Sequence, residues 1–158
     1  MPLADKLVQL AVDQVGIREI GSNQGPPITK YAGGREEPWC AHFLAWLFRT
    51  CGAPLPGDIE PSVSQHNPIA KVSTMWGNLV RDGYQVGIPR PGDIVAWSNR
   101  LASDKGTGWH CGLVTAVEHD MGQSIDGNWR DGVERHRWRT YEKHIVGFAR
   151  MTEPPPST

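Results

Sequence analysis

The chain has 158 residues, of which 39% are hydrophobic and 21% are charged, and its formal net charge is -1. This length fits one domain with a hydrophobic core and leaves little room for a second. The near-neutral charge argues against nucleic acid or an anionic membrane as a partner, and no apolar run approaches the roughly 20 residues of a membrane span.

Three helices are predicted in the first half of the chain. Residues 3–15 carry apolar side chains at helical spacing, with Asp5 in the first turn. Residues 38–51 form the second helix, in which Pro38 suits the first helical position because its missing N–H has no intrahelical partner there. The third helix covers residues 70–81, with five side chains predicted to point inward: Val72, Met75, Trp76, Leu79 and Val80.

The segments beside these helices have the composition of loops. Residues 21–27 are rich in Gly, Ser, Asn and Pro, and residues 28–31 are expected to add one helical turn. Residues 54–68 hold four prolines and should follow the surface without regular structure. The opening residues 1–5 lack the basic region and long apolar core of a secretory signal. We therefore expect synthesis in the cytoplasm, and action on a cell wall only after release or delivery.

From Pro89 onward the pattern changes to strands. Five are predicted, beginning after a Pro-Gly-Asp turn: residues 94–97, 110–118, 123–129, 133–138 and 145–150. The polar stretch 98–108 is predicted to be a mobile loop. Helices first and antiparallel strands second indicate an α+β fold. We expect one domain over residues 1–150 and a disordered, proline-rich tail over residues 151–158.

Cys40 is the candidate nucleophile. Counted from Pro38 it is the third helical residue, where backbone N–H groups still lack intrahelical partners. The helix macrodipole places partial positive charge there, which favours a thiolate. The alternative is that Cys40 is a small buried hydrophobic residue, as most free cysteines are. With Cys51 and Cys111 the cysteines number three, and neither a disulfide framework nor a zinc-ligand pattern is predicted.

A thiol nucleophile needs a base and a group that orients the base. His110 starts a predicted strand, and Asp126 and Asn128 project from one face of the next, so either can accept the imidazole N–H. His110 shares that face only if the 118–122 connection has an odd number of loop residues or a bulge, with Gly122 as a left-handed residue. Alternatively, His110 is a surface histidine and Asp-Gly-Asn is only a turn.

The remaining histidines serve as comparisons. His42 follows Cys40 by two residues and should point away from it on a helix. The others lie in polar stretches and are predicted to be solvated: His66, His119, His136 and His144.

Five blocks of sequence occur in a fixed order: Trp39-Cys40-Ala41-x-Phe43, Pro91-Gly92-Asp93-Ile94-Val95, His110-x-Gly112-Leu113-Val114, Asp126-x-Asn128-Trp129 and Val146-Gly147-Phe148. In this order they resemble the CHAP family of cysteine amidohydrolases, of the papain-like group that includes the NlpC/P60 peptidases. The resemblance implies N-terminal helices packed on a small antiparallel sheet, and hydrolysis of amide bonds in bacterial peptidoglycan. It implies Cys40 as the nucleophile, His110 as the base, Asp126 in the place of the orienting acid and Asn128 as its neighbouring Asn.

Two departures from the family pattern bear on the site. Many members have Gln before the cysteine, where its side chain helps to hold an oxyanion. Trp39 stands there instead, so Tyr31 is considered as a second donor beside the Cys40 N–H. Some members bind calcium through aspartates before the cysteine. Only Glu36 and Glu37 lie there in this chain, so no metal and no cofactor are expected.

The chain has seven tryptophans. Trp39, Trp109 and Trp129 adjoin the proposed site in sequence, and their flat amphipathic rings suit the binding of a glycopeptide. The alternative is that these rings fill a small core. The core interpretation is preferred for three others: Trp46, Trp76 and Trp97.

The resemblance leads to a preferred function and three alternatives. The preferred function is a peptidoglycan hydrolase, an N-acetylmuramoyl-L-alanine amidase or an endopeptidase, that acts as a phage endolysin or as a tail-associated lysin in the phage particle. The second is an injected antibacterial effector, with an immunity protein as its partner. The third is a cell-wall-binding module without turnover, and the fourth is a zinc hydrolase.

Overall fold

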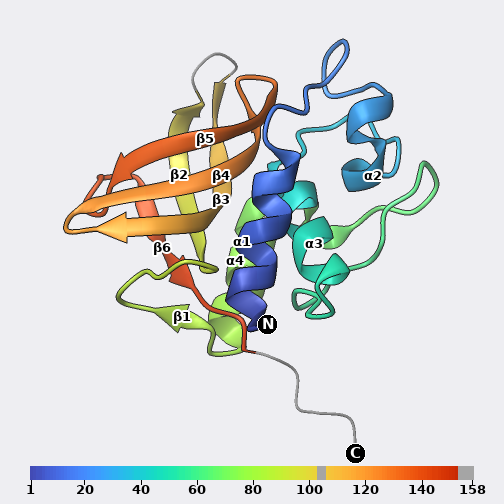
Figure 1. The fold of residues 1–158 in the computed structure, drawn as a ribbon. Helices are drawn as coiled ribbons and strands as arrows, with labels where there is room; N and C mark the ends of the chain where they lie inside the picture. Colours follow the sequence, from blue (N-terminus) through green and yellow to red (C-terminus); the bar gives the residue numbers. More distant parts are fainter. Residues whose placement is uncertain (103–105, 153–158) are drawn as a thin grey trace, which may run out of the picture.

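The computed structural model describes residues 1–102 and 106–152, which form a six-stranded antiparallel sheet with helices on one side (Figure 1). The order across the sheet is β1-β6-β2-β3-β4-β5. The strands are β1 Gln85–Val86, β2 Ile94–Ala102, β3 Gly106–Glu118, β4 Met121–Trp129, β5 Gly132–Arg139 and β6 Ile145–Ala149. The α+β class and the five predicted strands are confirmed. The sequence pattern missed β1, because two residues carry no alternation to detect.

The helices are α1 Leu3–Gln14, α2 Thr29–Ala32, α3 Cys40–Thr50 and α4 Val72–Arg81, with 3-10 turns at Pro26–Ile28 and Pro68–Ala70. In α3, eight of eleven residues are buried. This helix therefore packs on nearly all sides. Within the described ranges, no helix combines the length and the apolar character needed to cross a membrane.

The sheet carries a hydrophobic core on each face. Along β2, Ile94 and Ala96 belong to the core beneath the helices, whereas Val95 and Trp97 belong to a smaller core on the opposite face. This alternation is the two-residue period of a strand. Both faces of β2 are therefore buried over residues 94–97, which explains the continuous apolar run that the sequence shows there.

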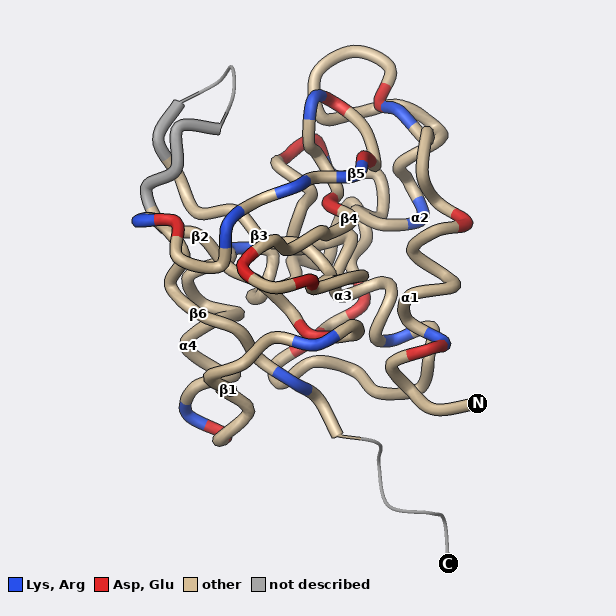
Figure 2. Tube along the Cα trace, turned by 60° about the vertical axis from the view of Figure 1, so that its left-hand side comes forward, with Lys and Arg blue, Asp and Glu red and all other residues tan. Residues whose placement is uncertain are grey.

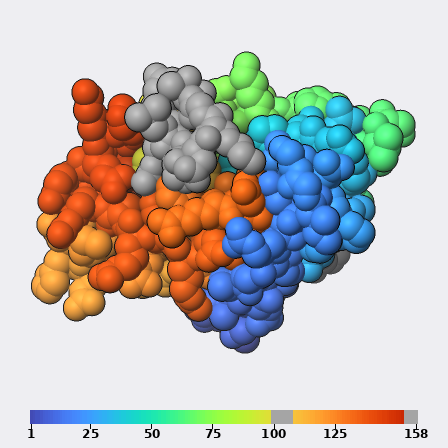
Figure 3. Space-filling model, turned by 90° about the horizontal axis from the view of Figure 1, so that it is seen from above, coloured from blue at the N-terminus to red at the C-terminus, as the bar shows by residue number. Residues whose placement is uncertain are grey.

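The segment after α1 covers part of the outer edge of β5. The Gly16 N–H donates to the Val133 carbonyl (2.9 Å), and the Val133 N–H donates to the Ile17 carbonyl (2.8 Å). Figure 3 shows this blue segment packed against the orange strand residues. Farther along β5, arginines mark the edge (Figure 2) and disfavour pairing with another chain: Arg135, Arg137 and Arg139.

Three local predictions are wrong. α3 begins at Cys40 with Trp39 as its N-cap, so Pro38 precedes the helix. Val80 is 42% exposed, because it lies on the outer side of α4. Most of the predicted loop 98–108 instead extends β2 and β3, since cross-strand pairing continues as far as Ala102 and Gly106. The rest of that loop, 103–105, and the predicted tail from residue 153 onward lie outside the described residues.

Candidate active site

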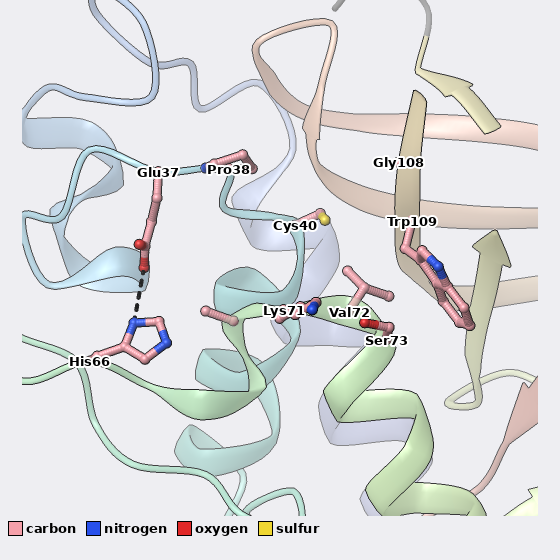
Figure 4. A pocket seen from close by; sticks show the side chains of 10 residues that line it. Glu37, Pro38, Cys40, His66, Lys71, Val72, Ser73, Gly108 and Trp109 are labelled. Carbon is pink, nitrogen blue, oxygen red and sulfur yellow. Dashed lines mark ion pairs between the residues drawn. The ribbon is translucent and has the colours of Figure 1, made fainter. Parts of the chain in front are cut away.

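Cys40 is the first residue of α3 and lines a cleft of about 430 Å³ (Figure 4). Its side chain is nearly buried, with 7% exposure for the residue. Backbone N–H groups in the first turn of a helix have no intrahelical acceptor, and the macrodipole is positive there. A thiolate at Cys40 is therefore favoured, although the helix begins two residues later than the sequence indicated.

The opposite wall of the cleft comes from the start of α4 and the segment before it. His66, Lys71 and Ser73 line the cleft there, and Trp109 of β3 lies across from them (Figure 4). The sequence predicted a helix here but gave no indication that its start lines a cleft, because the proline-rich segment before it has no periodicity. Two features of this wall suit an acidic ligand. One is the positively charged Lys71 ammonium, and the other is the first turn of α4, where the helix macrodipole is positive.

His110 lies between Cys40 and Asp126. Its Nε2 is 2.8 Å from the Asp126 Oδ2 atom, and the neighbouring Cys40 sulfur helps to raise the pKa of the ring. An ionised carboxylate only accepts hydrogen bonds, so Nε2 carries a proton and Nδ1 is left for the sulfur. The arrangement is that of a nucleophile, a base and an orienting acid.

A bulge in β3 brings His110 and Asp126 to one face of the sheet. Near the β3–β4 turn, Val117 pairs with Gly122, but the register shifts by one residue between Val114 and Ala116. Without this shift, His110 and Asp126 would project from opposite faces. The predicted requirement for an odd loop or a bulge is thus met by a bulge.

The left-handed residue of that turn is not the one predicted. His119 has a φ of 54°, whereas Gly122 is not among the residues of positive φ. Gly122 instead accommodates the Trp138 ring, which lies where a Cβ would be. The glycine at position 122 is therefore explained by its close packing with Trp138 and not by a turn.

Asp126 is fully buried and accepts three side-chain hydrogen bonds. His110 and His136 both donate to Oδ2, each at 2.8 Å, and the Ser124 hydroxyl donates to Oδ1 at 2.5 Å. The Trp138 indole N–H in turn donates to the Ser124 oxygen (3.1 Å). These partners fix the carboxylate against rotation and stabilise its negative charge.

The electrostatics favour a thiolate–imidazolium pair. A hydrogen bond from Cys111 is the largest cause that lowers the pKa of Cys40, and His110 lowers that pKa further against the cost of burial. Burial alone would lower the pKa of His110, but hydrogen bonds with Asp126 and Cys40 outweigh it and raise the pKa to about 9. Burial raises the pKa of Cys111. We assign the negative charge to Cys40 because only this sulfur also faces an imidazole and a helix N-terminus.

Asp126 and Asn128 differ in what they contact. Asn128 adopts a left-handed backbone conformation, with a φ of 56°, and its Nδ2 lies 3.4 Å from the Asn23 oxygen. The local chain has turned at Asn128, so it no longer follows the strand period that placed it beside Asp126. Of the two predicted alternatives, Asp126 is the one that accepts from His110.

Two residues predicted to bind substrate have no accessible surface. Trp39 and Tyr31 are fully buried and stack on each other with centroids 5.6 Å apart. The Trp39 indole donates to Glu19 (2.8 Å), and the Tyr31 hydroxyl donates to Gln14 (2.8 Å). Both rings belong to the core, which does not support the predicted substrate contact of Trp39 or the oxyanion donor considered at Tyr31.

The other two flanking tryptophans take different places. Trp109 is 36% exposed and lines the cleft, as a substrate-binding ring would. Trp129 is buried and stacks on His136, with centroids 4.1 Å apart and planes at 17°. It also lies 5.2 Å from the His110 ring. Trp129 therefore covers the two histidines and keeps solvent from them.

The surroundings of His136 differ from the prediction. His136 was predicted to be solvated, but it is only 6% exposed and is bonded to Asp126. A signal was available, since His136 and Trp138 alternate with arginines along β5 and so define its buried face. His42 is fully buried and bonds to Glu37 (2.7 Å).

Among the described residues, three side chains have the composition of a metal site. Ligand atoms of His110, Asp126 and His136 all lie within 4.8 Å of one another. Each of these ligand atoms is already used in the hydrogen bonds to Asp126. A metal ion here would therefore have to displace the proton that orients His110, so we derive no step through a metal.

Comparison with known proteins identifies a family and a fold. Residues 31–128 match the family model of the CHAP domain. The crystal structure of Ly7917 with the hydrolyzing product of MDP is similar, with a TM-score of 0.60 and 14% identity, over 94% of this chain and 62% of that chain. A crystal structure of Ly7917 gives a TM-score of 0.57 and 15% identity over the same shares. The chain thus spans less than two thirds of these neighbours. No curated protein matches it.

Proposed function

The chain belongs to the CHAP domain family, and we propose that it is a cysteine-dependent hydrolase that cleaves an amide bond in bacterial peptidoglycan. The observation that carries the proposal is the sequence of contacts from Cys40 through His110 to Asp126 at the wall of a cleft. Residues 1–150 act as one catalytic domain in this proposal. The biological setting that we favour is a phage endolysin or a tail-associated lysin.

The reaction begins with the Cys40 thiolate. It attacks the carbonyl carbon of the scissile amide, and a C–S bond forms while the carbonyl oxygen takes up the negative charge. The Cys40 N–H, in the unpaired first turn of α3, is placed to donate to that oxygen. The C–N bond then breaks as the His110 Nδ1 proton passes to the departing amine.

Hydrolysis of the thioester returns the enzyme to its starting state. Neutral His110 takes a proton from water, and the resulting hydroxide attacks the thioester carbon. The C–S bond breaks, the acid product leaves, and the thiolate–imidazolium pair is restored. Asp126 contributes by holding the Nε2 proton of His110, so that Nδ1 faces the sulfur throughout.

The cleft favours a substrate with both apolar and acidic parts. Trp109 supplies a flat ring for the apolar face of a sugar or peptide, and Lys71 supplies a cation for a carboxylate. Peptidoglycan stem peptides contain both kinds of group. The Ly7917 structure that holds the hydrolyzing product of MDP makes MDP a reasonable small substrate to test on this chain.

The test is digestion of purified peptidoglycan by the native protein and by Cys40→Ala, followed by mass spectrometry of new amino termini. We expect new termini with the native protein only. The termini also distinguish an amidase, which separates sugar from peptide, from an endopeptidase. Cys51→Ala is the matched control, because Cys51 is a free cysteine at the other end of α3 and should be dispensable.

Two results would count against the proposal. If neither protein releases new termini, the hydrolase proposal is wrong. If Cys40→Ala digests as well as the native protein, the cysteine mechanism is wrong.

A further inference from the structure

A second imidazole contacts the orienting carboxylate. His136 Nδ1 lies 2.8 Å from Asp126 Oδ2, the same oxygen that accepts from His110. The mechanism proposed above uses only His110. A cysteine–histidine–acid site has no need of a second buried histidine, so its presence calls for a physical explanation.

The packing around His136 fixes where its N–H points. The ring stacks on Trp129 on one side, with centroids 4.1 Å apart, and lies 5.1 Å from the Trp97 ring. Because the carboxylate can only accept, His136 Nδ1 must carry a proton. The two indoles thus hold a donor in a fixed direction toward Asp126.

We propose that His136 is a positioning residue, which holds the Asp126 carboxylate in the orientation that His110 requires and shares its negative charge. The proposal rests on the proposed function for its catalytic consequence, but its geometric part is independent of the substrate. Ser124 restrains the other carboxylate oxygen. Without His136, Oδ2 would lose one of its two donors, and the carboxylate would be less firmly held.

The sign of the expected pH effect follows from the groups around His110. The titratable groups that face this network are Cys40 from α3, Asp126 from β4, and Cys111 and His110 itself from β3. When the His136 donor is removed, the negative charge of Asp126 is no longer shared with a second hydrogen bond at Oδ2 and interacts more strongly with His110. The imidazolium form of His110 is then stabilised further, so its deprotonation moves to higher pH.

Two variants separate a lost donor from lost packing. His136→Phe keeps a flat ring between the indoles but has no N–H, whereas His136→Asn places an amide nitrogen near the former Nδ1 position. We expect His136→Phe to lower kcat for peptidoglycan by about tenfold, the equivalent of one weakened charge-assisted hydrogen bond, with little change in KM. His136→Asn should recover most of that loss.

The rate of Cys40 alkylation by iodoacetamide, measured against pH by mass spectrometry of the Cys40 peptide, needs no substrate. In His136→Phe the alkaline limb of this profile should move upward, and in His136→Asn it should return toward the native position. Equal profiles for native protein and His136→Phe would overturn the proposal, as would a folded His136→Asn that behaves like His136→Phe. Shifted profiles in a protein that releases no termini would reject the proposed function and leave this inference standing.

A measurement on the native protein guards against variants that fail to fold. Heteronuclear NMR of the ring nitrogens should find His136 Nδ1 protonated wherever Asp126 is ionised. An unprotonated Nδ1 under those conditions would overturn the proposal without any substitution.

Discussion

Gly112 faces the Asp126 carboxylate so closely that a Cβ at position 112 would overlap its Oδ1 atom. This glycine is the third residue of the His110-x-Gly112 block, on the same face of β3 as the histidine. The carboxylate that orients His110 therefore occupies the space that a side chain at position 112 would need. The glycine in this block is explained by the position of Asp126 and not by a turn.

Gly112→Ala should abolish most of the activity while the fold is retained. The added methyl group would push Asp126 away from His110, and a misplacement of about 1 Å at a catalytic group can cost on the order of 100-fold in rate. The measurement is peptidoglycan hydrolysis together with thermal unfolding.

Gly77→Ala is the matched control for that substitution. Apart from its chain neighbours and the nearby backbone of its own helix, no atom lies within 4 Å of a Cβ at Gly77, which is inside α4. It should keep full activity and gain about 0.5–1 kcal/mol in the free energy of unfolding. Full activity in Gly112→Ala would mean that Asp126 does not need its observed position.

The pH dependence of hydrolysis should have an alkaline limb near pH 9. The active pair exists above the pKa of Cys40, which is lowered, and below the pKa of His110, which is raised to about 9. Asp126→Asn keeps an acceptor for His110 but removes the negative charge. The pKa of His110 should therefore fall, and the alkaline limb of kcat/KM should move to lower pH. An unchanged limb in Asp126→Asn would contradict the assignment of this limb to His110.

Asp126 should also make the protein sensitive to acid. Hydrogen bonds from His110 and His136 outweigh burial and hold the pKa of Asp126 below its ordinary value of 3.8. A group whose pKa is lowered on folding contributes stability that is fully present above the unfolded value and is lost as pH falls through the folded value. Urea unfolding should show native protein more stable than Asp126→Asn near neutral pH, with the difference shrinking below pH 3.8.

The exposed Asp5→Asn serves as a comparison for this acid effect. At neutral pH this surface substitution should change the free energy of unfolding by no more than about 0.5 kcal/mol. If the difference in unfolding free energy between native protein and Asp126→Asn does not change with pH, the carboxylate is not stabilised as we describe.

Two tryptophans near the site should behave in opposite ways. Trp109→Ala removes a ring that lines the cleft, so KM should rise by up to about tenfold, with unfolding free energy within about 0.5 kcal/mol of native. Trp39→Ala removes a fully buried ring and should cost about 3–5 kcal/mol in unfolding free energy. Kinetics and denaturant unfolding on both variants test this, and the reverse pattern would refute the assignment of Trp109 to the cleft.

The main helices and strands could be predicted from the sequence because they depend on local patterns. Helical spacing located α1, α3 and α4, and a change of period located the strands. The relation between His110 and Asp126 was also accessible, because strand parity requires a bulge or an odd loop if the two are to meet. Local patterns did not reveal that the bulge lies between Val114 and Ala116 rather than at the turn.

What the sequence did not reveal depends on contacts between distant segments. Trp39 adjoins Cys40 along the chain, yet its ring points into the core against Tyr31. His136 lies far from His110 in sequence, and its place on Asp126 follows from the pairing of β4 with β5. Adjacency in sequence is a poor guide to adjacency at a site, because neighbouring side chains on a strand or helix diverge.

The central claim is that Cys40 is ionised at neutral pH because the hydrogen bond from Cys111 and the neighbouring His110 together lower its pKa. The most direct test is the ultraviolet absorbance of the thiolate against pH, taken as the difference between native protein and Cys40→Ala and repeated for His110→Ala. We predict a thiolate that forms well below pH 9 in native protein and shifts upward when His110 is removed. A thiolate that appears only near the ordinary thiol pKa of 9.0, with or without His110, would contradict the account.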